Sequence, residues 1–154
     1  MEQNYAIYQT RLGRLRIQYS NSKITELSKV EFSAVNDGIR NALTDRAIKE
    51  INEYLDGIRT SFDISLLYKG TTFQNKVWKE LLKIPYGETR TYQDIAIDIG
   101  NPNACRAVGM ACNKNPIAIL IPCHRVIGKN KKLTGYAGGL DMKKLLLDVE
   151  TNKR

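Results

Sequence analysis

The stretch that decides the fold runs from residue 91 to residue 116 and reads TYQDIAIDIGNPNACRAVGMACNKNP. Thr91 is a residue that commonly begins helices, and Asp94 three positions later completes a capping box. The residues after it have the spacing of one buried helical face, and they are Ile95, Ala96 and Ile99. This pattern predicts a short amphipathic helix that begins just after Thr91.

A second short helix follows almost at once. Gly100 is expected to end the first helix, and residues 101–102, Asn-Pro, form a turn. Residues 104–114 then read as the next helix, which Pro116 closes. Two short helices joined by a tight turn predict a helix-turn-helix.

Helices are predicted on both sides of this motif. Upstream, Thr71 and Gln74 form another capping box. It opens an apolar stripe made of Phe73, Val77, Leu81 and Leu82. Residues 85–87, Pro-Tyr-Gly, break that helix. Near the carboxyl end, Asp141 is expected to cap a last helix, with an apolar side made of Leu145, Leu146 and Val149.

The first 66 residues have a different character. Two alternating patterns predict half-buried strands, namely Leu15, Ile17, Tyr19 and Phe62, Ile64, Leu66. Between them a helix is predicted, with Thr44 or Asp45 as its cap. Its apolar face consists of Ala47, Ile48, Ile51, Tyr54 and Leu55. We therefore expect an α/β (α+β) fold. A small sheet-plus-helix support domain spans residues 1–66, and a mostly helical domain with the helix-turn-helix spans residues 67–154.

The charge of the chain is placed unevenly. Lys and Arg outnumber Asp and Glu by 24 to 16, a net charge of +8. Residues 1–70 carry 10 basic and 9 acidic side chains, whereas residues 71–154 carry 14 and 7. This asymmetry indicates either a nucleic-acid partner for the second half or a solubilising surface, and charge alone does not decide between them.

Composition excludes several other classes of protein. Hydrophobic residues make up 42% and charged residues 26%, which is typical of a globular domain. No run approaches the roughly 18 apolar residues of a membrane span, and residues 1–8 do not resemble a signal peptide. We therefore expect no membrane association and a cytoplasmic location.

The three cysteines are Cys105, Cys112 and Cys123. An odd number of cysteines without an export signal argues against a disulfide framework. Their spacing does not match a zinc site, and the chain has one histidine, so no bound metal is expected. No role follows for Cys112 beyond packing as a small apolar side chain.

Cys123 is the candidate for chemistry. An apolar run at residues 117–120, read as a strand, leads to it, and His124 and Arg125 follow. A thiol reacts as the thiolate, which a neighbouring base or positive charge favours. His124 could accept the proton and Arg125 adds positive potential. The alternative interpretation of this pair is a buried cysteine that happens to precede a surface histidine.

Residues 121–126, IPCHRV, resemble the acceptor motif of the O6-alkylguanine-DNA alkyltransferase family. The resemblance extends from about Phe73 to Glu150 through several separated blocks. These blocks are Tyr92-Gln93, Arg106-Ala107-Val108-Gly109, Asn115-Pro116, Tyr136-Ala137-Gly138-Gly139-Leu140 and the closing residues 146–150.

The resemblance implies DNA repair by direct reversal. Cys123 would accept an alkyl group from O6 of guanine, irreversibly and once per molecule, as a suicide transferase without a cofactor. His124 would be the base that reaches the thiol through a water, and Glu150 would hold its imidazole. Asn115 would be the hinge that joins the helix-turn-helix to the acceptor segment. Activity on O4-alkylthymine stays open.

The resemblance also implies how DNA is bound. A monomer would place the helix-turn-helix in the minor groove of duplex DNA and flip the damaged nucleotide out of the stack. Arg106 would fill the vacated space, and Tyr92 would push the phosphate. Ala107 and Gly109 would allow close approach. Arg125 is also expected among the residues that contact DNA.

The flipped guanine would be recognised largely by backbone groups. The carbonyls of Cys123 and Val126 would accept from its amine, and the Tyr92 hydroxyl would serve its ring nitrogen. The N–H of Ala137 would face O6, and Tyr136 would wall the pocket.

Two other functions are consistent with parts of the sequence. A non-catalytic DNA-binding module would use the basic helix-turn-helix, but the chain keeps Cys123. A Cys-His hydrolase would use Cys123 and His124, but it would have no use for the DNA-binding blocks. Methyl transfer from labelled DNA, counted per protein molecule, separates the three.

Overall fold

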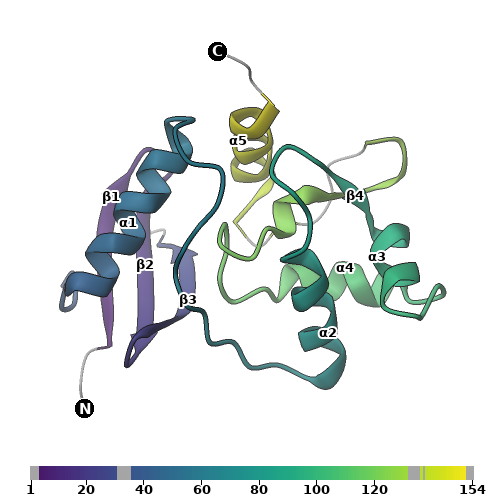
Figure 1. The fold of residues 1–154 in the computed structure, drawn as a ribbon, viewed down its shortest axis with the longest axis horizontal. Coiled ribbons are helices and arrows are strands. Elements are labelled where there is room, and N and C mark those ends of the chain that lie inside the picture. The colour runs from purple at the N-terminus through teal and green to yellow at the C-terminus, as the bar shows by residue number, and fades with distance from the viewer. Residues whose placement is uncertain (1–3, 31–35, 132–135, 137, 152–154) are drawn as a thin grey trace. The chain divides into compact units, whose positions relative to one another are not determined.

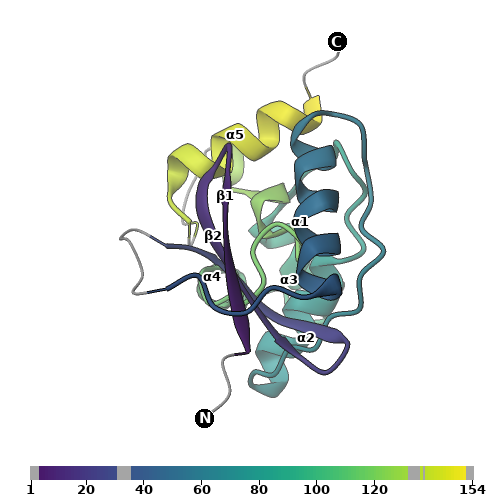
Figure 2. The same cartoon turned by 90° about the vertical axis from the view of Figure 1, so that its left-hand side faces the viewer.

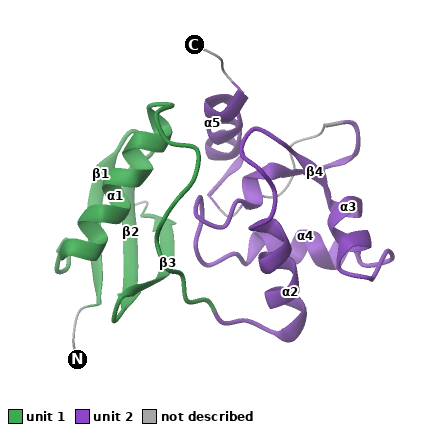
Figure 3. Cartoon of the chain, viewed as in Figure 1, with its two compact units in different colours: residues 1–68 green, residues 69–154 purple. Residues whose placement is uncertain are grey.

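A computed structural model describes residues 4–30, 36–131, 136 and 138–151. The chain divides into two compact units, Met1–Tyr68 and Lys69–Arg154 (Figure 3). The sequence led us to place the boundary after residue 66, and the structure divides the chain two residues later, after Tyr68. Each unit is described by itself.

The amino-terminal unit is built on a three-stranded antiparallel sheet. Its strands are β1 (Tyr5–Thr10), β2 (Gly13–Ser20) and β3 (Lys23–Lys29), in the order β1-β2-β3. Gly13 has a φ of 107°, which a side chain would oppose, so it suits the tight turn between β1 and β2. The predicted alternation in β2 is confirmed, because Leu15 and Ile17 are fully buried.

Helix α1 (Ala42–Leu55) lies beside this sheet (Figures 1 and 2). It begins earlier than Thr44 or Asp45, so the predicted cap was wrong. The cap is Asn41, whose side chain accepts the N–H of Thr44 at 2.8 Å, while the Thr44 hydroxyl accepts the N–H of Asn41 at 2.9 Å. Thr44 completes a capping box as its third helical residue, where Glu or Gln is usual.

The strand predicted at Phe62, Ile64 and Leu66 is also wrong. These side chains are half-buried in alternation, but the backbone forms only an isolated bridge between Leu66 and Ile24. The segment is held instead by the buried carboxylate of Glu50, which accepts the N–H of Asp63 at 3.0 Å. Alternating exposure therefore arises here without a hydrogen-bonded ladder.

The carboxyl-terminal unit is mostly helical. Its elements are α2 (Thr72–Leu81), β4 (Arg90–Thr91), α3 (Tyr92–Asp98), α4 (Cys105–Asn113), η1 (Cys123–Arg125), β5 (Val126–Ile127), η2 (Lys129–Lys131) and α5 (Leu140–Thr151). Strands β4 and β5 pair in parallel. A sheet followed by helices confirms the predicted mixed α/β fold. Within the described ranges, no helix is both long and apolar enough to cross a bilayer.

Helices α3 and α4 follow the sequence prediction closely. Thr91 accepts the N–H of Asp94 at 3.0 Å, and the Asp94 carboxylate accepts the N–H of Thr91 at 2.9 Å. Gly100 has a φ of 82°, as expected for a residue that ends a helix. Trp78 of α2 donates its indole N–H to the carbonyl of Ala111 at 2.8 Å, which fixes α4 against α2. The helix-turn-helix is thus anchored to α2 by the buried Trp78.

Residues 117–120 are a single bridge residue, Ile117, followed by a turn, and not the predicted strand. Every residue in it is buried, and Ile119 has a φ of 73°, which is costly for a β-branched side chain. The Asn115 side chain holds the turn at both ends. It accepts the N–H of Ile117 at 3.0 Å and donates to the carbonyl of Ile121 at 2.8 Å. The apolar run therefore serves as a buried turn before Cys123.

Replacing the cap of α1 tests this description of the amino-terminal unit. Asn41→Ala should lower the free energy of unfolding by about 1 kcal/mol, because an N–H at the start of the helix loses its acceptor. Urea unfolding followed by circular dichroism measures the change. Asn52→Ala is the matched control, since Asn52 is exposed inside the same helix, and it should not destabilise. Equal stability of the two variants would contradict the assignment of Asn41.

Candidate functional site

Cys123 begins the short helix η1 and is 2% exposed. The Asn115 side-chain amide donates to its sulfur at 3.0 Å. The same amide nitrogen holds the carbonyl of Ile121, so one side chain fixes both the turn and the thiol. The structure therefore brings together two of the predicted catalytic residues.

The thiol of Cys123 is held in its neutral form by burial. Burial raises the pKa of Cys123 to about 11, while the hydrogen bond from Asn115 and the charge of Lys143 act in the opposite direction. A sulfur with such a pKa is protonated at neutral pH. Its use as a nucleophile requires a base at hand.

His124 and Glu150 form a buried pair. His124 Nε2 lies 2.6 Å from Glu150 Oε2, and both residues are excluded from solvent. Burial lowers the pKa of His124 below its ordinary value, and the hydrogen bond to Glu150 only partly opposes this. A neutral imidazole can accept a proton, so the pair has the protonation state that a general base requires.

Arg125 does not lie where the sequence led us to expect it. It is 7% exposed, and its Nε donates to both oxygens of Glu150, at 2.9 and 3.1 Å. Its Nη1 donates to the carbonyl of Ile84 at 2.7 Å. The N–H of Gly87 also reaches Glu150 Oε1, at 3.0 Å. Because its guanidinium is buried on Glu150, we do not keep Arg125 among the residues that contact DNA.

Lys143 belongs to the site but was missed by sequence reasoning. It is fully buried, and its Nζ donates to the carbonyl of Val126 at 2.7 Å and to the Tyr92 hydroxyl at 3.5 Å. Burial lowers the pKa of Lys143, and the thiols of Cys123 and Cys112 raise it in turn. A signal existed in the sequence, because Lys143 lies on the buried face of α5 with Met142, Leu146 and Glu150.

Tyr136 and Gly138 lie close together near the site. A Cβ on Gly138 would lie 2.6 Å from Met142 Sδ and 2.9 Å from the Tyr136 ring, so a side chain at this position would have to displace both neighbours. The Tyr136 hydroxyl is buried and has no hydrogen-bond partner within the described residues. Burial raises the pKa of Tyr136, and the neighbouring Cys123 adds to this. Ala137 lies outside the described residues.

Three of the residues expected to contact DNA, Arg106, Ala107 and Gly109, belong to α4. Arg106 and Ala107 are exposed, and Met110 further along the same helix is 66% exposed. A Cβ added to Gly109 would meet the Tyr92 ring at 3.8 Å, which is an ordinary contact. The fold itself therefore does not require glycine at position 109.

The remaining cysteines differ in exposure. Cys105 is exposed on α4, whereas Cys112 is buried, and burial raises the pKa of its thiol. Within the part of the chain that the structure describes, no group of three or more His, Cys, Asp or Glu residues could hold a metal ion.

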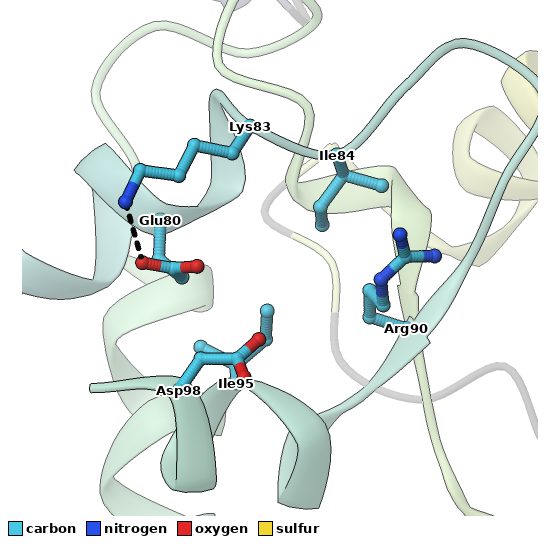
Figure 4. Close-up of a pocket in the computed structure, with 6 residues that line it drawn as sticks. All are labelled: Glu80, Lys83, Ile84, Arg90, Ile95 and Asp98. Atoms are coloured by element: carbon cyan, nitrogen blue, oxygen red, sulfur yellow. Dashed lines mark hydrogen bonds and ion pairs between the residues drawn. The ribbon is translucent and has the colours of Figure 1, made fainter. Parts of the chain in front are cut away.

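A small pocket of about 130 Å³ lies apart from Cys123 (Figure 4). It is lined by Glu80, Lys83, Ile84, Arg90, Ile95 and Asp98. Charges of both signs surround it, and Lys83 forms an ion pair with Glu80 at 3.3 Å (Figure 4). Cys123, His124 and Glu150 do not line this pocket.

Fold and site together define a helix-turn-helix domain that carries a buried cysteine beside a buried histidine–glutamate pair. The family described as 6-O-methylguanine DNA methyltransferase, DNA binding domain, matches residues 72–152. The chain belongs to this family of methylated-DNA–protein-cysteine methyltransferases. The resemblance inferred from residues 73–150 is thereby confirmed.

Individual relatives extend the match beyond residues 72–152. A methylated-DNA–protein-cysteine methyltransferase of Methanosarcina barkeri is 59% identical over 69% of this chain and 67% of its own. A probable one of Acanthamoeba polyphaga mimivirus is 47% identical over 94% of each. The solved structure of Mycobacterium tuberculosis OGT in complex with DNA superposes with a TM-score of 0.88, at 45% identity, over 96% of this chain and 92% of its own. The likeness therefore includes the amino-terminal unit.

The His124–Glu150 pair predicts a pH dependence. His124→Gln should lower the rate of methyl transfer at neutral pH by roughly 10²–10⁴-fold, because the thiol loses its proton acceptor. The rate should recover at high pH, where the thiolate forms without help. Glu150→Gln should show a milder form of this shift. Single-turnover rates on a methylated duplex across about pH 5–10 measure it.

The wild-type curve has its own expected shape. Because the pKa of His124 is lowered, the rate should hold as pH falls to about 6.5, the ordinary histidine value, and decline only below it. Glu88→Gln removes an exposed carboxylate in the same unit and serves as the control. If both site variants kept the wild-type curve, the activation scheme would be wrong.

Proposed function

We propose that this chain repairs O6-alkylguanine in duplex DNA by moving the alkyl group onto Cys123 in a single irreversible step. The observation that carries the proposal is the arrangement around the sulfur. Asn115 contacts Cys123 Sγ at 3.0 Å, and the adjacent His124 is hydrogen-bonded to Glu150 at 2.6 Å. Membership of the family supports the same reaction.

The proposed transfer needs only the thiol of Cys123, the base His124 and the alkylated guanine. The thiol proton passes through a water to His124, and the sulfur attacks the alkyl carbon. A carbon–sulfur bond forms while the bond from carbon to O6 breaks, and its electron pair stays on the guanine, which then takes up a proton. The product thioether is stable, and no residue of the site would remove the group. One transfer per molecule follows, with no cofactor.

The burial of Cys123 dictates how DNA must be bound. A sulfur that is 2% exposed cannot reach O6 of a stacked base, so the nucleotide has to leave the stack. Arg106 would fill the vacated space from the exposed face of α4, and Tyr92 would push the phosphate. Ala107 and Gly109 are small enough for close approach in the minor groove.

The pocket for the flipped base would be polar on one side and aromatic on the other. The carbonyl of Val126 would accept from the guanine amine, and the Tyr92 hydroxyl would serve a ring nitrogen. Lys143 contacts both of these groups, which fixes the distance between them. Tyr136 would form the aromatic wall.

Duplex DNA is the proposed partner, bound by a monomer. Residues 71–154 carry 14 basic and 7 acidic side chains, and the M. tuberculosis relative was solved with DNA. Contacts to phosphates should make binding weaken with salt and depend little on sequence.

The test of the function is the stoichiometry and position of transfer. After incubation with a duplex that contains O6-methylguanine, intact-mass spectrometry should find one added methyl group per chain. Peptide mapping should place it on the Cys123 peptide. Cys123→Ser should abolish transfer and keep DNA binding, because the basic surface is unchanged.

Cys105→Ser is the matched control, since Cys105 is exposed on α4 and should not accept the methyl group. Transfer to Cys105 or Cys112, or many turnovers per molecule, would refute the proposal.

Arg106 should matter for duplex substrate and little for the transfer step. Arg106→Ala should slow repair of a methylated duplex, because nothing then offsets the lost stacking. The free base O6-benzylguanine has no stack to leave, so its reaction with Cys123 should be nearly unchanged. Arg106→Lys should recover part of the loss, since it keeps the charge but loses the planar guanidinium.

Single-turnover rates on the two substrates decide the matter. An equal loss on both would mean that Arg106 supports the fold or the acceptor, and its assignment as the intercalating residue would have to be dropped.

A further inference from the structure

We propose that Arg125 is a positioning residue for alkyl transfer, which acts through Glu150 to keep His124 a neutral base. The inference rests on the proposed function and assigns to Arg125 a task other than DNA contact. It begins from geometry, because Arg125 donates to both carboxylate oxygens of the buried Glu150.

The guanidinium is fixed at both ends. Its Nε spans the two carboxylate oxygens of Glu150 at 2.9 and 3.1 Å, and its Nη1 reaches the Ile84 carbonyl at 2.7 Å. The Tyr86 ring centroid lies 5.8 Å from Cζ. A planar group held in this way fixes the rotation of the carboxylate. Oε2 is thereby directed to His124, 2.6 Å away.

The local helix explains how neighbouring residues reach different partners. Residues Cys123–Arg125 form one turn of a 3-10 helix, in which consecutive side chains point about 120° apart. Cys123 meets Asn115, while His124 and Arg125 both reach Glu150. His124 and Arg125 therefore both bind the carboxylate of Glu150, while Cys123 binds the amide of Asn115.

The charges give the arrangement its chemical effect. Burial is the main cause that lowers the pKa of His124. Among the charged neighbours, Glu150 favours the imidazolium, and Arg125 and Lys143 oppose it. The positive charge of Arg125 offsets part of the attraction of Glu150 for the imidazolium. Without Arg125, the buried carboxylate would attract a proton to the pair. An imidazolium cannot accept the thiol proton, so the rate of transfer would fall at neutral pH and recover only at higher pH.

The experiment uses the fact that the chain contains one histidine. Proton NMR can follow the titration of its imidazole in the intact protein without DNA or substrate. In Arg125→Gln the pKa of His124 should rise by about one unit, a tenfold change in the ratio of imidazole to imidazolium. Arg125→Lys should give a smaller rise in the pKa of His124. The positive charge remains, but the planar group that binds both Glu150 and the Ile84 carbonyl is lost.

Transfer kinetics provide the second readout. In Arg125→Gln the acid limb of the pH–rate curve should move upward by the same amount, and the rate should approach that of the wild type at high pH. The shift should be equal with a methylated duplex and with O6-benzylguanine, and the dissociation constant for DNA should stay within about twofold.

Arg59→Gln is the control for losing an arginine beside a buried glutamate. Arg59 Nη1 lies 3.6 Å from the buried Glu50 in the amino-terminal unit, far along the chain from the histidine. This variant should leave the His124 titration unchanged. If Arg125→Gln does not fold, the Arg125→Lys titration carries the test.

An unchanged His124 titration in a folded Arg125 variant overturns the inference, whether the rate falls equally at every pH or DNA binding weakens instead. A shifted titration without any transfer by the wild-type chain would contradict the proposed function, while the effect of Arg125 on His124 would stand. The two failures are therefore distinguishable.

Discussion

The carboxylate of Glu150 is the group on which the rest of the proposed acceptor site depends. It receives hydrogen bonds from Arg125 and Gly87 and lies against the His124 ring, so helix α5, helix η1 and the loop after α2 meet at one buried charge. A buried charge is costly unless its partners are all present. Loss of any one of them leaves the others with an uncompensated charge, which ties the geometry of the acceptor to the packing of the whole unit.

The connection between acceptor and helix-turn-helix is a short one. Strands β4 and β5 are two residues each and pair Arg90 with Val126 and Thr91 with Ile127. Thr91 caps the first helix of the motif, and Val126 directly follows η1. Lys143 adds a second link, since it contacts both Val126 and Tyr92. The surface proposed to bind DNA and the sulfur are therefore positioned by the same few residues.

The sequence predicted what depends on neighbours along the chain. Helices α2 and α3 were found because Thr71 and Thr91 each start a capping box, a signal contained in four residues. The cap at Asn41 was missed because its third helical residue is Thr44. Residues 62–66 and 117–120 looked like strands, since apolar patterns report burial and not the ladder that a strand needs.

The acceptor site shows the same limit. The resemblance pointed to Cys123 and its neighbours, and the pair of His124 with Glu150 is seen in the structure. The partners of Arg125 and Lys143 come from elements distant in sequence, so no local pattern could assign them.

The buried position of the single tryptophan makes it a probe of folding. Trp78 is 2% exposed and donates to the Ala111 carbonyl, so its ultraviolet emission reports on the packing of the carboxyl-terminal unit. Emission and dichroism recorded side by side can thus tell which half of the chain melts first.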